Sequence, residues 1–400
     1  MTGGPSSPYS EGMPPSTSPA AGTRPQNLAR ILGIVHEDGA QSRAALTERT
    51  GLNRSTIADL VAELVRRRLV DERVPETPGR VGRPSPVVSA SADVVAIAVN
   101  PEVDAMEIAA VGLDRSIRVR ERLESESLQT PDAVAAVIAE RIAAWSSDEL
   151  AGARIEAIGI AVPGLVRTSD GVVRNAPHLE WRDVPLADLV RAATGIPVFI
   201  GNDASLGAVA EHRYGAGRGL EDVVYLNGGA SGIGGGLIIH GIPVAGAGGY
   251  AGEFGQNRPR ISDDADRRTS DGALEAEVSR RLLLDAVDLD AADDETLDAE
   301  LTASESADVS AEVARQARVL ASALANAVNV LNPALVVLGG FLATIAALRA
   351  EQIADDVAAL AMSESAEGLE IRPAALGADR LLIGAAELAF AELLSDPSER

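Results

Sequence analysis

From residue 92 onward the chain alternates short runs of strand-forming residues with helical segments, and this alternation restricts the possible fold more than any other feature. The runs ADVVAIAVN, AMEIAAVGL and IEAIGIAVPGLV are strand-like, whereas PDAVAAVIAERIAAWSSDEL is helical. A second cycle begins at LEDVVYLNGGASGIGGGLIIHGIPV, includes a long helix over about 309–331 and closes with PALVVLGGF. The pattern predicts an α/β protein of two similar lobes, with a ligand in the cleft between them. The acidic stretch over 284–300 is interpreted as a solvated helix face or loop.

The first ninety residues follow a different pattern. Residues 1–24 are rich in Pro, Ser and Gly and are predicted to be a disordered tail. Three helices are expected after it, and their boundary residues are Pro25 with Gly39, Ser42 with Gly51, and Asn53 as the third N-cap. The third helix places an apolar stripe on one side, made of Ile57, Leu60, Val61, Leu64 and Val65.

The second and third of these helices have the arrangement of a helix-turn-helix, which reads base edges with the first residues of its second helix. The candidate major-groove residues are Asn53, Arg54, Ser55 and Thr56. A strand, a turn rich in Gly and Pro and a second strand follow, as in the wing of a winged helix. The candidate minor-groove residues at its tip are Arg80 and Arg83. The alternative is a three-helix interaction or dimerisation module whose arginines are solvated.

The charge is distributed unevenly along the chain, with a basic N-terminal part and an acidic remainder. Residues 24–83 contain 11 Arg and 8 acidic residues, whereas residues 84–400 contain 24 Arg and 50 acidic residues. The acidic body would repel nucleic acid and confine DNA contact to the front of the chain. No secretory or membrane-length apolar segment occurs, so a cytoplasmic location is expected. The absence of cysteine excludes disulfides, thiolate catalysis and Cys-ligated zinc.

Several stretches of the body carry polar groups suited to a sugar. IGNDASLGAVAEHR places Asn202 and Asp203 between a strand and a helix, where a carboxylate can accept a substrate hydroxyl proton or simply act as an N-cap. The turn in LNGGASGIGGG can bring backbone N–H groups close to a phosphate, although glycine-rich hairpins without ligands are common. Glu253 and Glu275 add two carboxylates next to glycine-rich backbone.

The stretches AVPGLV, IGNDASLGAVAE, LNGGASGIGGG, AGEFGQ, ALE, NPALVVLGG and LLIGAAELA occur in this order behind the predicted winged helix. In this order they resemble the ROK family of repressors, open reading frames and sugar kinases, over about residues 26–395. The resemblance implies an N-terminal winged helix-turn-helix followed by a two-lobed, actin-like (ribonuclease H-like) sugar kinase fold. The expected parts are a tail over 1–24, a DNA-binding domain over 25–90, a first lobe over 91–205 and a second lobe over 206–400, whose last helix returns to the first lobe.

The resemblance also implies which residues bind a sugar. Asn202 and Asp203 match the family's sugar-binding pair, in which kinases use the Asp as general base. Gly164 matches a glycine that lines the same pocket. Glu253 matches the Glu of the ExGH motif, and Glu275 matches the Glu that closes the family's zinc segment.

Three departures from the family pattern argue against catalysis. Kinases of the family have a DxGGT phosphate loop, whereas AIAVNPEVDAME places Ala98 about where the Asp should be, and ATP would meet Pro101 and Glu102. Gln256 replaces the zinc-site His and the Cys ligands are missing, so neither a metal nor a cofactor is expected. The loop over 257–272 must then be ordered by packing or be mobile. The third departure is milder, since the glycine-rich hairpin reads GASG where kinases prefer GTG.

The sequence therefore predicts a sugar-responsive, non-enzymatic transcriptional regulator, most simply a repressor of genes for carbohydrate uptake or catabolism, such as xylose metabolism. It would bind a pseudo-palindromic DNA operator as a homodimer or homotetramer. The main alternative is an active ATP-dependent sugar kinase. Two others are a module that binds sugar or protein without DNA, and a sensor of a phosphorylated sugar or a partner protein, for which Arg174 and Arg182 lie near the pocket segment.

Overall fold

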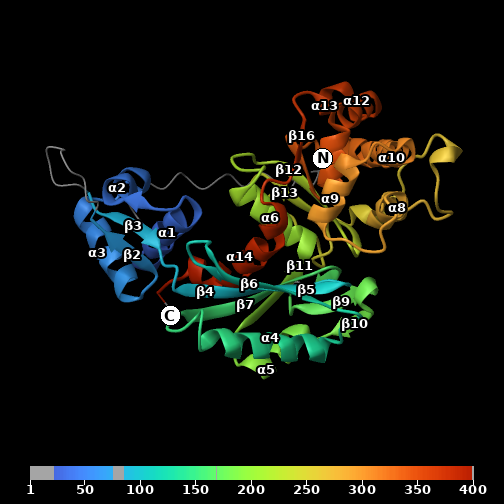
Figure 1. Ribbon diagram of the computed structural model, residues 1–400. Helices are drawn as coiled ribbons and strands as arrows, with labels where there is room; N and C mark the ends of the chain where they lie inside the picture. Colours follow the sequence, from blue (N-terminus) through green and yellow to red (C-terminus); the bar gives the residue numbers. More distant parts are fainter. Residues whose placement is uncertain (1–21, 75–84, 168, 399–400) are drawn as a thin grey trace, which may run out of the picture. The chain divides into compact units, whose positions relative to one another are not determined.

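The computed structural model describes residues 22–74, 85–167 and 169–398 (Figure 1). The chain divides into two compact units, one made of residues 1–90 with 392–400 and the other of residues 91–391. Helix α14 (Arg380–Ser395) therefore begins in the second unit and ends in the first.

The first unit contains three helices and a three-stranded sheet in the order β1-β3-β2. Its elements are α1 (Arg24–Glu37), β1 (Gln41–Ser42), α2 (Arg43–Thr50), α3 (Arg54–Arg66), β2 (Val70–Arg73) and β3 (Val87–Ala90). The caps predicted from the sequence are confirmed: the Ser42 hydroxyl accepts a hydrogen bond from Ala45 N at 3.1 Å, and Asn53 Oδ1 accepts one from Thr56 N at 2.8 Å. The residues that join β2 to β3, including Arg80 and Arg83, lie outside the described residues.

Two details of this unit correct the prediction. Helix α1 begins at Arg24, inside the expected tail, because Thr23 precedes it as N-cap and its backbone N–H binds Gln26 Oε1 at 2.8 Å. The rest of the tail up to residue 21 lies outside the described residues. On α3 the residues Ile57, Leu60, Val61 and Leu64 are buried, but Val65 is 39% exposed. Neighbouring residues on a helix point about 100° apart, so the core that takes Leu64 leaves Val65 on the rim.

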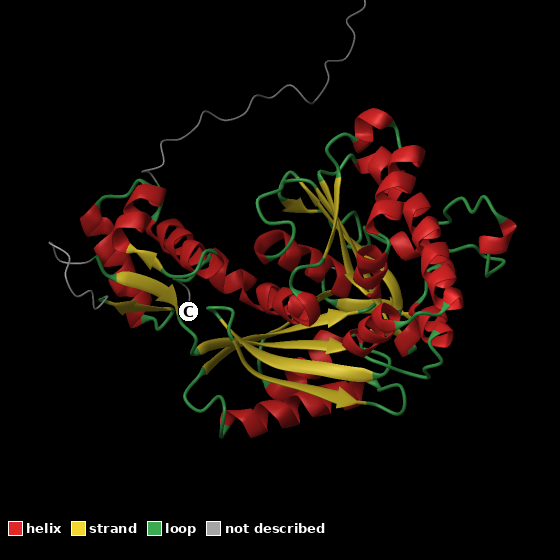
Figure 2. Ribbon diagram, turned by 45° about the horizontal axis from the view of Figure 1, so that its top comes forward, coloured by secondary structure: helices red, strands yellow, loops and turns green. Residues whose placement is uncertain are grey.

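The second unit contains two five-stranded sheets of the same topology (Figure 2). In each sheet the first three strands form an antiparallel meander, and two later strands extend it in parallel on the other side, giving the orders β11-β7-β4-β5-β6 and β16-β15-β12-β13-β14. The strands of the first sheet are β4 (Val94–Pro101), β5 (Ala105–Gly112), β6 (Ile117–Glu124), β7 (Arg154–Val162) and β11 (Val198–Asn202). Those of the second are β12 (Val223–Gly229), β13 (Gly232–Ile239), β14 (Ile242–Pro243), β15 (Leu335–Gly340) and β16 (Glu370–Pro373). The predicted pair of similar lobes is confirmed by this repeated strand order.

A small sheet and two helices complete the first lobe, and the remaining helices belong mostly to the second. The small sheet contains β8 (Leu165–Arg167), β9 (Val172–Ala176) and β10 (Trp181–Val184). The helices α4 (Pro131–Ser146) and α5 (Leu186–Thr194) cover one face of the first large sheet (Figure 1). The later helices are α6 (Asp203–Tyr214), α7 (Leu274–Glu277), α8 (Arg280–Ala286), α9 (Asp294–Ala303), α10 (Ala307–Leu331), α11 (Phe341–Leu348), α12 (Ala350–Leu360) and α13 (Ser363–Ala366).

The long predicted helix is confirmed as α10, which buries Val313, Ala317, Leu320, Leu324 and Val328 in the core of the second lobe. Helix α14 packs directly on the backbone of the first lobe: a Cβ on Gly159 of β7 would lie 1.9 Å from the Ala385 carbonyl oxygen. Only glycine fits there. Among the described residues, no helix combines the length and the apolar character that crossing a bilayer demands.

Candidate functional site

The two lobes of the second unit enclose a polar pocket. The first lobe contributes Pro163, Gly164, Pro177, His178, Asn202 and Asp203. The second lobe contributes Ser231, Gly232, Ile233, Gly234, Glu253, Gln256 and Glu275. All five residues assigned to sugar binding from the sequence therefore line one pocket, although they come from four separate segments of the chain.

Asn202 and Asp203 meet the pocket at the start of α6. Asn202 is the N-cap, and its Oδ1 accepts a hydrogen bond from Ser205 N at 2.9 Å. Its amide donates to the Gly164 carbonyl at 3.1 Å and to Asp203 Oδ1 at 3.1 Å. The cap role that the sequence allowed for Asp203 thus belongs to Asn202, which leaves the Asp203 carboxylate to the pocket.

Gly164 brings backbone close to the pocket floor. Its φ is +153°, and a Cβ would lie 2.6 Å from the Asn175 carbonyl oxygen of the neighbouring strand β9. Any side chain here would be strained and would displace β9. Gly164 therefore fixes the carbonyl group that orients the Asn202 amide.

The second lobe supplies an acidic wall. Glu275 Oε1 accepts a hydrogen bond from Gln256 Nε2 at 2.5 Å, and its other oxygen lies 3.4 Å from Ile233 N of the glycine-rich hairpin. Glu253 is exposed at the pocket rim. Desolvation of its carboxyl by the surrounding pocket atoms raises the pKa of Glu253, although the residue is exposed at the rim, and the nearby Glu275 raises it further.

Asp203 has the electrostatics of a proton acceptor. Burial raises the pKa of Asp203 to about 6, with a further contribution from Glu253, whereas the Ala204 N–H and Arg380 oppose the shift. A carboxylate with a pKa near neutrality is suited both to accepting hydrogen bonds from hydroxyls and to general-base chemistry. The pocket therefore presents a carboxylate that is chemically suited to accept a hydrogen bond from a hydroxyl.

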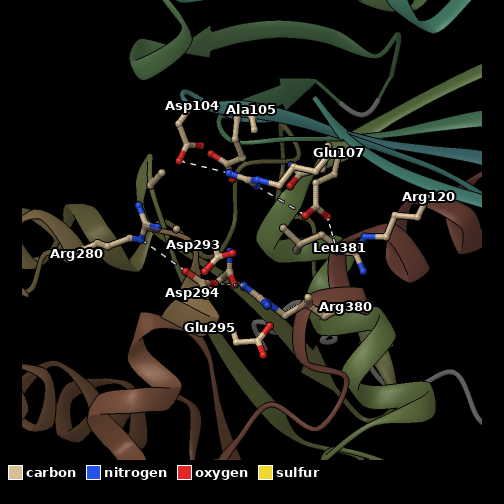
Figure 3. A pocket seen from close by; sticks show the side chains of 17 residues that line it. Asp104, Ala105, Glu107, Arg120, Arg280, Asp293, Asp294, Glu295, Arg380 and Leu381 are labelled. Carbon is tan, nitrogen blue, oxygen red and sulfur yellow. Dashed lines mark hydrogen bonds and ion pairs between the residues drawn. The ribbon is translucent and has the colours of Figure 1, made fainter. Parts of the chain in front are cut away.

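A second, larger cavity of about 390 Å³ is lined by Gly229 and Ala230 of the glycine-rich hairpin and by charged residues from several segments (Figure 3). Its lining includes Asn100 near the end of β4, and Glu102 and Asp104 from the β4–β5 turn, which is the first-lobe counterpart of the hairpin between β12 and β13. Glu102 approaches the hairpin, with its carboxyl 3.5 Å from the position of a Cβ on Gly229. Burial raises the pKa of Glu102 to about 8, with Asp203 and Asp104 adding to the rise and a hydrogen bond with Ser231 opposing it.

Ion pairs cross the same cavity. Asp294 lies between two arginines, 3.6 Å from Arg280 Nε and 3.6 Å from Arg380 Nη2 (Figure 3). The Arg380 Nε–H also donates to Asn227 Oδ1 at 3.0 Å. Residues 293–295 are exposed, as expected for a solvated helix face or loop, and Asp294 additionally pairs with arginines that lie 14 and 86 residues away in the sequence.

The register of the expected phosphate loop also needs correction. Ala98, which the resemblance placed at the loop Asp, lies in the middle of β4 and pairs with Ala109 and Gly159. The residue that faces the cavity near the strand end is Asn100, whose amide donates to the Ala161 carbonyl at 2.9 Å. The turn itself carries no glycine and presents Glu102, as the sequence indicated.

The pocket includes residues that sequence reasoning missed, and it omits two that were considered. His178, Ser231 and Gln256 line it. Arg174 instead pairs with Asp183 at 2.7 Å, and neither Arg174 nor Arg182 is among the pocket residues.

The second candidate site is the start of α3 in the first unit. Asn53, Arg54 and Ser55 are exposed, and Thr56 is half-buried. The Ser55 hydroxyl donates to Asn53 Oδ1 at 2.7 Å, so the Asn53 oxygen serves the helix cap and only its amide is left for a ligand. Within the described part of the chain, no hydrogen bond or ion pair engages the Arg54 side chain, in contrast to Arg24, Arg43 and Arg49, which pair with acids.

The fold and the pocket define a class: a two-lobed protein of the sugar kinase type with a small helical unit that has the winged helix-turn-helix pattern at its front. The chain belongs to the ROK family, whose match covers residues 96–392. The family resemblance and the fold class predicted from the sequence are confirmed.

Two curated relatives and one solved structure show the range of this family. The xylose repressor of Caldicellulosiruptor bescii is 30% identical over 256 residues, which cover 60% of this chain and 64% of the repressor. The chain thus spans less than two thirds of that repressor. A glucokinase of Halalkalibacterium halodurans is 30% identical over 253 residues, covering 57% of this chain and 74% of the kinase. A structure of a ROK family transcriptional regulator, a homolog of E. coli MLC, has 21% identity, a TM-score of 0.73, and covers 93% of this chain and 97% of its own.

Proposed function

We propose that this protein is a sugar-responsive transcriptional repressor whose kinase-like pocket binds the effector and whose N-terminal unit binds DNA. The observation that carries the proposal is one pocket that unites Gly164, Asn202, Asp203, Glu253 and Glu275, in a chain that also has an exposed helix-turn-helix end. The similarity to xylose repressors supports the same function. The regulated genes would serve carbohydrate uptake or catabolism, and the cytoplasmic location stays a prediction.

The effector would be held by hydrogen bonds from its hydroxyls to convergent acceptors. At pH 7 Asp203, with a pKa of about 6, is mostly ionised and can accept from two hydroxyls. Glu275 is already hydrogen-bonded by Gln256, which fixes its orientation before a ligand arrives. Pre-organised acceptors of this kind reduce the entropy lost on binding.

A direct path through the fold would connect effector binding to DNA binding. Helix α6 begins at Asp203, and at its other end Arg213 Nη1 and Tyr214 Oη donate to the buried Glu387 of α14 at 2.5 and 2.9 Å. Helix α14 then continues into the residues grouped with the DNA-binding unit. A sugar that shifts the lobes would thus act on α14 through one helix, and binding to DNA would change because the two states differ in sugar affinity.

Fluorescence anisotropy tests the proposal directly. The full chain is titrated onto DNA from upstream of its own coding region at two salt concentrations, with xylose and panels of other pentoses, hexoses, N-acetylhexosamines and their phosphates. We expect tight, salt-sensitive binding that one sugar weakens. Absence of DNA binding under every condition would exclude the role as a transcriptional regulator and would favour the alternative of a sugar- or protein-binding module.

The alternative of an active sugar kinase is favoured by the pKa of Asp203 and by the similarity to glucokinases. The larger cavity argues against a kinase. A nucleoside triphosphate in it would lie near Glu102, Asp294 and their acidic neighbours. Arg280 and Arg380, which could bind phosphates, already pair with Asp294. Phosphoryl transfer needs backbone N–H groups and cations around the phosphates.

We therefore expect no ATP turnover above background in a coupled assay with magnesium and a hexose and pentose panel. The control is the Asp203→Asn variant, which lacks the candidate base. Sugar-dependent ADP formation that disappears in this variant would establish the kinase and overturn the non-enzymatic assignment.

Arg54→Ala is expected to lower the affinity for operator DNA by about 1 to 3 kcal/mol if Arg54 reads a guanine. The proposed major-groove set is Asn53, Arg54, Ser55 and Thr56, and the proposed wing contacts are Arg80 and Arg83. Arg66→Ala is the matched control, since Arg66 is exposed at the other end of the same helix. Anisotropy on operator and scrambled DNA separates the roles: an equal loss on both sequences would assign Arg54 to a phosphate.

A homodimer or homotetramer is proposed as the assembly that presents two recognition helices to a pseudo-palindromic operator. Symmetric dimers place their helices about one turn of DNA apart, which suits half-sites about 10 base pairs apart or a multiple of that. Sedimentation of the protein with and without operator measures this directly.

A further inference from the structure

The segment over 257–272 joins the pocket residue Gln256 to helix α7, which carries Glu275. In the family this region binds zinc through a His and three Cys. This chain has Gln256 at the His position and contains no cysteine, so its residues do not fit that metal. Within the described ranges, no group of three or more His, Asp or Glu side chains is arranged to hold a metal ion either. Some other interaction must hold the segment.

One face of helix α10 supplies that interaction. Arg315 donates through Nη1 to the Asp266 carbonyl at 2.8 Å and through Nη2 to the Glu277 carbonyl at 2.6 Å. One turn further, Arg318 binds both carboxylate oxygens of Asp266 at 2.9 and 2.7 Å. These arginines are three residues apart on the helix and therefore reach the segment from the same side.

A buried carboxylate completes the attachment. Glu277 is 0% exposed and accepts hydrogen bonds from Arg268 N at 2.7 Å, Thr269 N at 2.9 Å and the Thr269 hydroxyl at 2.8 Å. Burial alone would raise the pKa of Glu277, but these donors and Arg315 outweigh it and hold the pKa below its usual value. The carboxylate is therefore ionised and binds the segment at the position where the chain returns to α7.

The arrangement acts on the pocket because Glu277 and Glu275 share the single turn of α7. Arg315 donates a hydrogen bond to a backbone carbonyl of that turn, and Glu277 accepts hydrogen bonds from backbone N–H groups of the segment that precedes it. Glu275 on the same turn faces Gln256 at 2.5 Å in the pocket. A displacement of α7 would thus move Glu275 relative to the rest of the sugar site.

These buried ion pairs contribute little net stability, because removing charged groups from water costs free energy. Arg315 is only 2% exposed, and Glu312, which accepts from Arg315 Nε at 2.9 Å, is largely covered as well. Buried ion pairs seldom add net stability over apolar packing of the same volume, and their best-supported role is to specify one geometry. A binding pocket without a metal needs other contacts that hold its side chains in place.

We propose that Arg315 and Glu277 are positioning residues of the effector pocket, which fix the 257–272 segment and Glu275 through hydrogen bonds and ion pairs and make the pocket independent of metal. The proposal rests on the proposed function in one respect, that the pocket binds a sugar. It resolves the question left by the sequence: the segment is ordered by polar contacts to α10.

The test compares Arg315→Met and Glu277→Gln with Arg281→Met in the full chain. Arg281 is a matched control, since it is 59% exposed in its side chain and pairs with Asp285 on the surface of α8. We expect Arg315→Met to weaken binding of the sugar identified by anisotropy about 10-fold or more, Glu277→Gln to weaken it less, and Arg281→Met to leave it unchanged. The DNA affinity without sugar should stay the same in all three, and a zinc chelator should not change sugar binding by the unmodified protein.

Hydrogen exchange gives a readout that needs no sugar. The amides of Arg268 and Thr269 are bound to Glu277, so their exchange should accelerate about 10-fold or more in Arg315→Met and Glu277→Gln but not in Arg281→Met. Unchanged exchange over 266–277, or sugar binding that a chelator abolishes and zinc restores, would overturn the proposal. If no sugar binds to the unmodified protein, the proposed function fails, whereas the exchange result still decides the role of Arg315 and Glu277. Should Arg315→Met fail to fold, Glu277→Gln and Arg318→Met provide the same comparison.

Discussion

Replacing Asp203 by Asn is expected to weaken sugar binding about 100-fold or more, without changing the affinity of the sugar-free protein for DNA. The variant keeps the shape of the side chain but loses its charge, and a hydrogen bond to a charged group contributes about 1.5 to 3 kcal/mol. In addition, the Asn202 amide already donates to Asp203 Oδ1, so an introduced amide would turn its oxygen toward Asn202 and its NH2 toward the ligand. Titration calorimetry measures the loss.

The control for Asp203→Asn is Asp188→Asn, which removes an exposed carboxylate of α5 in the same lobe that pairs with Arg191 at 2.7 Å. Acidity gives an independent check. Because the pKa of Asp203 is about 6, the unmodified protein should lose sugar affinity as the pH falls from 7 to 5, and the Asn variant should lose less. Sugar binding by Asp203→Asn that equals the unmodified protein at pH 7 would exclude Asp203 from the contact.

Glu102→Gln is expected to stabilise the second unit, and increasingly so as the pH rises from 6 to 8. The folded protein keeps a proton on Glu102 up to a pKa of about 8, whereas the unfolded chain releases it near the ordinary value of 4.5. The native state thus binds more protons in this window, and the free energy of unfolding must fall with pH by up to about 1.4 kcal/mol per pH unit. Gln carries no charge at any pH and removes this loss.

Urea unfolding followed by tryptophan fluorescence suits the measurement, because both tryptophans, Trp145 and Trp181, are buried in the lobe that contains Glu102. The part of the window from pH 7 to 8 lies above the pKa of Asp203, so the difference between the two proteins there reports Glu102. Glu107→Gln is the comparison within the same cavity. Glu107 pairs with Arg120 at 2.8 Å, so its loss should destabilise. Parallel stability curves for Glu102→Gln and the unmodified protein would show that Glu102 is ionised in the fold.

Local sequence signals were sufficient for most of the architecture. Side-chain caps and a glycine in the left-handed conformation are short-range devices, so Ser42, Gly51 and Asn53 located the helices of the first unit to within a residue. Continuous apolar runs identified the central strands β4, β5 and β7, which are buried on both faces. Strand β6 reads IRVRERLE and lies at a sheet edge, where charged residues alternate with apolar ones, and it was not predicted.

Long-range convergence was harder to foresee. The five pocket residues were assigned through the order of family motifs, and periodicity alone would not have joined segments that lie more than 100 residues apart. No sequence pattern indicated that Arg280 and Arg380 would enclose Asp294, or that Arg315 would reach Asp266. The misplacement of Ala98 has a similar origin, because only the strand pairing fixes which residue of β4 faces the cavity.

The sharing of α14 between the two units constrains how this protein can be divided into fragments. The first unit is not a continuous stretch of sequence, since residues 392–400 group with residues 1–90. A gene fusion that attached only the first ninety codons to a sugar kinase would omit the last turn of α14 and its tail. Isolating the first unit therefore requires residues from both ends of the chain, because a single cut after residue 90 separates residues 392–400 from the unit with which they group.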